Sequence, residues 1–133
     1  MNGASVKVYS KAKDGTKKLS ANFKVSEFAC SDGSDVVFIS PELVEVLQKI
    51  RDHFGVEVSP TNAYRTPSHN KAVGGTATSQ HLYGLAADIV VSGVAPKDVA
   101  AYAETLMKNT GGIGIYSDFT HIDVRSEKSR WNG

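Results

Sequence analysis

Two amphipathic segments, set irregularly among short strand-like segments, constrain the fold of this chain most strongly. A helix is predicted over 40–53, because Ser40 can cap it, Pro41 suits its first turn, and Gly55 ends the pattern. Its apolar side chains recur at three- and four-residue spacing: Leu43, Val46, Leu47, Ile50 and Phe54. A second helix is expected to begin at Pro96 and to stop before a pair of glycines.

The strand-like segments determine the fold class. Residues 56–64 predict a strand that Pro60 restricts to the sheet edge, and residues 86–91 predict a short apolar strand. Residues 66–75 predict a turn with a short helix, and 112–124 predict a hairpin. Because helices and strands do not alternate regularly, we predict an α+β domain with an antiparallel sheet covered by helices, rather than a doubly wound parallel sheet.

Length and charge limit the domain organisation and the partners. A chain of 133 residues has the length of one domain, and we divide it into a partly mobile basic leader, 1–18, and a single domain, 19–133. A net charge of +1 argues against nucleic acid as a partner, and no apolar run is long enough to span a membrane. The single cysteine excludes an intramolecular disulfide, and we expect a monomer.

Metal-ligating residue types gather in two segments, 79–88 and 118–123. A catalytic zinc ion takes three nitrogen or oxygen ligands and keeps a fourth position open, and His81, Asp88 and His121 supply such a set. Asp88 lies in a strongly apolar segment, where a buried carboxylate without a cation would be costly. Taken singly, a histidine of either segment is more often a surface or satisfied core residue than a metal ligand.

The two segments also carry a resemblance. Ser-x-His-x-x-Gly-x-Ala-x-Asp at 79–88 and Asp-x-x-His-x-Asp at 118–123 resemble the D-alanyl-D-alanine carboxypeptidase family of zinc peptidases. The likeness extends from Leu19 to Trp131 and includes Ala63-Tyr64-Arg65 and His121-Ile122-Asp123-Val124-Arg125. It implies the fold shared with the Hedgehog signalling domain, one zinc ion per chain, and peptidoglycan stem peptides as substrate. The amino terminus lacks the order of a signal peptide, so we expect synthesis in the cytoplasm and action on the cell wall after release or another export route.

Roles for the remaining residues follow from the resemblance and from charge. Asp118 is the predicted general base, although aspartate is also frequent in turns, and many relatives have glutamate at this position. Arg65 is predicted to bind a substrate carboxylate or a developing oxyanion, with an ordinary exposed arginine as the alternative. Ser79 is predicted either to touch substrate or to satisfy the turn. Asp123 is predicted to orient a ligand histidine, with a plain surface carboxylate as the alternative.

Two other functions stay open beside D-alanyl-D-alanine carboxypeptidase activity. One is an L-alanyl-D-glutamate endopeptidase of the endolysin kind, and the other is a zinc-holding binding or phage structural module without turnover. Asp118 favours an enzyme, because a module that only holds zinc has no need of a base. A cysteine nucleophile is disfavoured, because carboxylates flank Cys30 and oppose a thiolate; His53 and His69 are expected on the surface.

Overall fold

A five-stranded sheet forms the centre of the fold in the computed structural model, which describes residues 4–133. The strands lie in the order β5-β6-β8-β7-β9. Their bounds are β5 Val58–Asn62, β6 Ala86–Val91, β7 Gly112–Ile115, β8 Thr120–Asp123 and β9 Ser129–Asn132. The pairs β5–β6, β6–β8 and β7–β8 are antiparallel, whereas β9 runs parallel to β7. The predicted α+β class is therefore confirmed, with one parallel pairing added by a strand that the sequence did not indicate.

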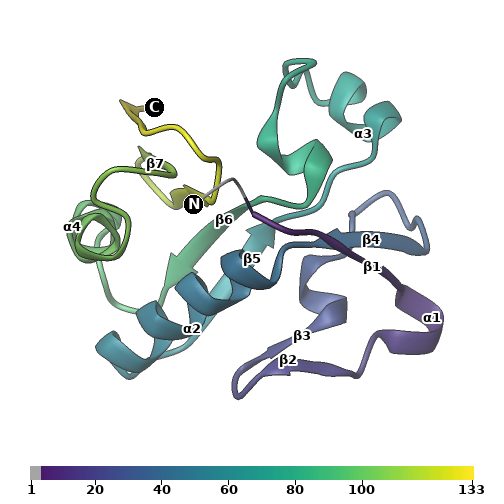
Figure 1. Ribbon diagram of the computed structural model, residues 1–133, viewed down its shortest axis with the longest axis horizontal. Helices are drawn as coiled ribbons and strands as arrows, with labels where there is room; N and C mark the ends of the chain where they lie inside the picture. The colour runs from purple at the N-terminus through teal and green to yellow at the C-terminus, as the bar shows by residue number, and fades with distance from the viewer. Residues whose placement is uncertain (1–3) are drawn as a thin grey trace.

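Two helices, α2 (Pro41–Phe54) and α4 (Pro96–Leu106), cover one face of this sheet. Figure 1 shows α2 lying across β5 and β6, with α4 beside β7. Ser40 caps α2 by accepting a hydrogen bond from the Leu43 amide at 3.4 Å, and Gly55 ends the helix in the left-handed conformation, as predicted. The residues Leu43, Leu47 and Ile50 of α2 are buried against the sheet face that carries Ile89, Ile113 and Ile122.

Residues 7–39 form a smaller layer beside the central sheet. The strand β1 (Lys7–Ser10) pairs with β4 (Val36–Ile39), and β2 (Lys18–Ser20) pairs with β3 (Phe23–Lys24). Two short helices, α1 (Lys11–Asp14) and η1 (Val25–Phe28), complete it. The predicted leader thus carries β1 and α1 over residues 7–14, while its first three residues lie outside the described ones. The sequence of this lysine-rich segment does not indicate β1, because β1 pairs with β4, which lies far from it in the chain. The boundary at residue 18 stays a prediction.

The predicted strands and short helix lie where the sequence placed them. The strand with Pro60 is an edge strand, because β5 is the first in the sheet order and pairs only with β6 in this sheet. The short helix α3 (Pro67–Ala72) begins at the proline that indicated it, and a single-turn helix, η2 (Gln80–Tyr83), precedes β6. Of the helices within residues 4–133, none has the length and apolar character required to cross a membrane.

Candidate metal centre

Strand register aligns one residue from each of the five strands in a row across the sheet. Asp88 of β6 pairs with Asn62 of β5 on one side and with His121 of β8 on the other. His121 pairs in turn with Gly114 of β7, which pairs with Trp131 of β9. Residues directly opposite one another project from the same face of a sheet. This row therefore lies on the face opposite the buried isoleucines and the helices α2 and α4.

His81 reaches the same face from outside the sheet. It lies on η2, whose first turn is capped by Ser79, the hydroxyl of which accepts a hydrogen bond from the His81 amide at 3.3 Å. The Nδ1 of His81 lies 2.7 Å from the carbonyl oxygen of Ala63, so Nδ1 carries the hydrogen and donates it. The other ring nitrogen, Nε2, lies 3.5 Å from Oδ1 of Asp88.

The three predicted ligands converge. His121 directs Nδ1 at Oδ1 of Asp88 from 3.0 Å, and single ligand atoms of His81, Asp88 and His121 all lie within 4.8 Å of one another. All three residues are buried. Their donor set, two imidazole nitrogens and one carboxylate oxygen, is one that zinc prefers, and three protein ligands leave a position free for a reactant. The residues present therefore fit a catalytic divalent metal ion.

Electrostatics at the three side chains agrees with a cation site. Burial raises the pKa of Asp88, but the hydrogen bonds from His121 and His81 outweigh it and hold that pKa well below its ordinary value. Burial lowers the pKa of His121, but the carboxylates of Asp123 and Asp88 outweigh it and raise that pKa above 6.5. The carboxylates of Asp88 and Asp123 thus favour a positive charge at the buried His121 ring. A metal ion bound at Nδ1 would supply that charge in place of a proton.

Behind His121, a buried carboxylate and an arginine extend the site. The Oδ2 of Asp123 lies 2.8 Å from Nε2 of His121, and Asp123 has no exposed surface. Arg125 donates to both oxygens of Asp123, from Nε at 2.8 Å and from Nη2 at 2.7 Å. Burial raises the pKa of Asp123, but the hydrogen bonds from His121 and Arg125 hold it well below its ordinary value. The alternative that Asp123 is a surface carboxylate is therefore wrong.

The glycines of β7 make this packing possible. A Cβ on Gly114 would lie 2.5 Å from the indole of Trp131, and a Cβ on Gly112 would lie 2.1 Å from Oδ2 of Asp123. Trp131 can therefore lean over Gly114 toward His121, and the two rings have centroids 4.9 Å apart. The glycines of β7 make room for Asp123 and Trp131 on this face of the sheet, whereas Ile113 between them is buried on the opposite face.

A cleft of about 870 Å³ joins these ligands to the other predicted site residues. Arg65, Ser79 and Asp118 line it together with His81, Asp88 and His121. Asp118 is exposed in the turn between β7 and β8. Ser79 makes the turn contact described above, which is one of its two predicted roles, and its contact with substrate stays a prediction. His53 is exposed, as expected, whereas His69 is half-buried and lines the cleft.

Sequence reasoning gave no role to three further residues of the cleft. Arg125 and Trp131 were noted within the resemblance alone, although their contacts with Asp123 and His121 place them at the site. Asn62 donates from Nδ2 to Oδ2 of Asp88 at 3.3 Å. The sequence alone could not identify Asn62, because its position opposite Asp88 follows only from the pairing of β5 with β6.

A second group of metal-ligating types, Cys30, Asp32 and His69, lies within the same 4.8 Å limit at the edge of the cleft. Here the polar atoms have partners in the protein. Asp32 accepts a hydrogen bond from the Thr66 hydroxyl at 2.7 Å, and Nε2 of His69 lies 3.2 Å from the Ser31 hydroxyl. Cys30 itself is buried. These contacts attach the loop after η1 to the first turn of α3.

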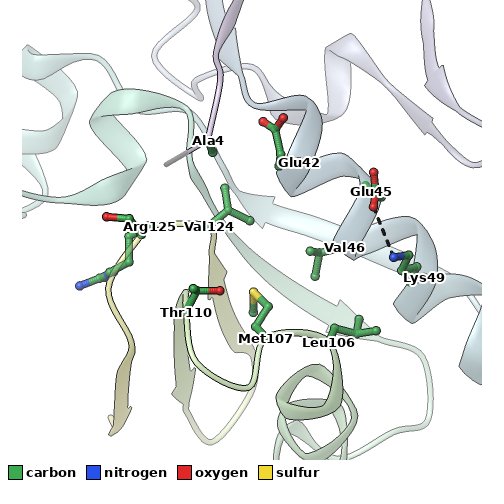
Figure 2. A pocket seen from close by; sticks show the side chains of 11 residues that line it. Ala4, Glu42, Glu45, Val46, Lys49, Leu106, Met107, Thr110, Val124 and Arg125 are labelled. Carbon is green, nitrogen blue, oxygen red and sulfur yellow. Dashed lines mark ion pairs between the residues drawn. The ribbon is translucent and has the colours of Figure 1, made fainter. Parts of the chain in front are cut away.

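A separate hollow of about 180 Å³ lies between α2, the end of α4 and the segment after β8. Figure 2 shows the ion pair of Glu45 and Lys49 at its rim, with Val46, Leu106 and Met107 below it. The residues lining it include no histidine or cysteine. Its two carboxylates, Glu42 and Glu45, belong to neither of the two groups of metal-ligating residues found among residues 4–133.

A family model described as Peptidase M15 matches residues 21–123, a span that includes the three converging candidate ligands and Asp118. No curated protein matches the chain.

Proposed function

We propose a function from one established premise, which is that the chain belongs to the peptidase M15 family. Membership supports a zinc-dependent metallopeptidase that acts on peptidoglycan. Within that class, we propose a D-alanyl-D-alanine carboxypeptidase that removes the terminal residue of the peptidoglycan stem peptide. The convergence of His81, Asp88 and His121 at the wall of one cleft carries the proposal.

His81, Asp88 and His121 would hold one zinc ion through Nε2, a carboxylate oxygen and Nδ1. A bound zinc ion supplies Lewis acidity, which lowers the pKa of a coordinated water to about 7 and polarises a carbonyl group. The protein contributes the orientation of the ligands. The Ala63 carbonyl holds His81 and the Asp123 carboxylate holds His121, so both rings keep the nitrogen opposite these contacts turned toward Asp88.

Asp118 is the proposed general base. It is exposed, lines the cleft and lies three residues before His121, so its carboxylate is available to substrate and water. We propose that it takes a proton from the attacking water and passes it to the amine nitrogen of the leaving residue. Such a role favours an enzyme over a module that only holds zinc.

Arg65 is the proposed binding group for the terminal carboxylate of the substrate. It lines the same cleft as the ligands, and its backbone amide donates to the carbonyl oxygen of His81 at 3.0 Å. The backbone contact couples the position of the arginine to that of the metal ligand. A guanidinium group in a partly buried cleft binds a carboxylate through charge-assisted hydrogen bonds.

Digestion of purified muropeptides tests the proposal, with the masses of the products as the readout. Loss of a single terminal alanine from pentapeptide stems is the expected result, and activity should disappear with a chelator and return with zinc. Cleavage between L-alanine and D-glutamate would instead assign an endopeptidase. A protein that holds zinc and cleaves no muropeptide would be a binding module.

A further inference from the structure

Arg65, Arg125 and Arg130 are partly buried, and their side-chain hydrogen-bond partners differ in charge. Arg125 is paired with the carboxylate of Asp123, and Arg130 is paired with that of Glu104 at 2.6 Å. Arg65 instead donates from Nη1 to the amide oxygen of Asn70 at 2.8 Å. Within residues 4–133, no carboxylate forms an ion pair with Arg65. Arg65 therefore enters the cleft as a cation whose charge the protein leaves uncompensated.

One donor of Arg65 is also unsatisfied. Among the described residues, its Nε is a buried side-chain atom without a hydrogen-bond partner. A buried donor without a partner lowers the free energy of unfolding, so each such group calls for an explanation, which a bound ligand or water can supply. Since Arg65 lines the cleft and has no ion-pair partner among residues 4–133, an anion bound in that cleft is the ligand class that suits its charge.

Asn70 is itself fixed by hydrogen bonds of both its side chain and its backbone. It is 4% exposed and lies on α3, and its Nδ2 donates to the carbonyl oxygen of Thr76 at 2.9 Å. Its backbone carbonyl accepts a hydrogen bond from the Gly75 amide at 2.8 Å. These two contacts with the loop orient the amide group, so that its oxygen, which can only accept, is presented to Arg65.

Gly75 leaves room for this arrangement. A Cβ at position 75 would lie 2.0 Å from Oδ1 of Asn70 and 2.8 Å from Nη1 of Arg65. The loop backbone therefore approaches the amide and the guanidinium group more closely than any side chain would allow. The arrangement immobilises the guanidinium group without adding a negative charge.

We propose that Asn70 is a positioning residue that holds Arg65 in the cleft as an uncompensated cation for a substrate carboxylate. The inference rests on the proposed function, in which Arg65 binds that carboxylate. A carboxylate at position 70 would have nearly the same shape but would pair with Arg65 and compete with the substrate. The neutral amide of Asn70 thus fixes the position of the Arg65 guanidinium group without neutralising its positive charge.

The test compares two stem pentapeptides, one with a free terminal carboxylate and one with a terminal amide. The wild-type zinc enzyme should favour the free acid. Asn70→Asp should raise KM for the free acid about 10- to 100-fold, roughly the effect of losing one charge-assisted hydrogen bond, with little change in kcat. Kinetics on the amide should stay unchanged. A residue with a purely structural role would affect both substrates alike.

Gly75→Ala provides a second variant that leaves Asn70 and Arg65 chemically intact. Like Asn70→Asp, it should reduce the preference for the free-acid substrate, because the added Cβ displaces the Asn70 side-chain amide from Arg65. Asn109→Asp is the matched control, since it adds the same charge at an exposed position outside the cleft and should leave both substrates unaffected. Zinc content and thermal stability, measured for each variant, show whether its site is assembled.

The wild-type comparison separates the two levels of the inference. Equal cleavage of acid and amide by the wild-type enzyme would overturn recognition of a terminal carboxylate by Arg65, and the role of Asn70 with it. A clear preference in the wild type that both Asn70→Asp and Gly75→Ala retain would overturn the role of Asn70 alone.

Discussion

The Nε2 of His121 lies 2.8 Å from a carboxylate oxygen of Asp123, a residue with no exposed surface. On the other side of the ring, Nδ1 faces Asp88 from 3.0 Å. The imidazole is therefore held between one carboxylate that shares the candidate metal centre and one that lies behind it. This arrangement assigns different functions to the two aspartates of neighbouring strands.

Asp123→Asn is expected to weaken zinc binding about 10- to 100-fold, the usual effect of altering a partner that orients a metal-ligating histidine. The substitution keeps the shape of the side chain but removes the charge that orients the ring. Competition titration against a chelator measures the zinc dissociation constant. Asp98→Asn, at an exposed position in the first turn of α4, is the control. An unchanged constant would show that Asp123 has only a structural role.

One zinc ion is expected per chain, and replacement of any of His81, Asp88 or His121 by alanine should lower that content. Three ligands leave no spare group to retain the ion. Elemental analysis of the purified variants measures it, with His53→Ala as an exposed histidine control. Zinc should also raise the melting temperature of the wild type but not of Asp88→Ala. Full occupancy in Asp88→Ala would remove that residue from the ligand set.

Asp118→Asn should slow muropeptide cleavage by roughly 10²- to 10⁴-fold, because the amide cannot accept a proton from water. Zinc content should stay at the wild-type level, since Asp118 lies outside the three-ligand group. Asp118→Glu should retain intermediate activity, as the added methylene moves the carboxylate by about an ångström without removing the base. Steady-state rates establish this order, and an Asn variant as fast as the wild type would make Asp118 a turn residue only.

Glu104→Gln should lower the melting temperature at neutral pH and have little effect in acid. The hydrogen bond from Arg130 holds the pKa of Glu104 below its ordinary value of 4.5. A carboxylate with a lowered pKa stabilises the fold above the unfolded pKa, and this contribution is lost as pH falls through the folded value. Thermal melts from pH 7 to pH 3 test the prediction. Glu45→Gln, in the exposed pair with Lys49, should change little at either pH.

Sequence reasoning predicted the elements whose signals are local. Ser40, Pro41 and Gly55 delimit α2 because caps and turn conformations depend on adjacent residues. Pro60 predicted an edge strand because proline has no amide hydrogen to donate within a sheet. The grouping of His81, Asp88 and His121 was also accessible, because the two segments that contain them resemble motifs of a zinc peptidase family, although their spacing alone is a weak signal.

Long-range pairing decided the rest. The sequence does not show that β9 lies parallel to β7, that β1 pairs with β4, or that Trp131 reaches His121 across Gly114. Nor does it distinguish a charged partner of Arg125 from a neutral partner of Arg65. These relationships depend on strand register and on the packing of loops against helices, which residues distant in the chain determine together. The two motifs and the resemblance they carry therefore identified the candidate ligands. Only the tertiary structure determined which groups orient these ligands, and that Arg125 has a charged partner whereas Arg65 has a neutral one.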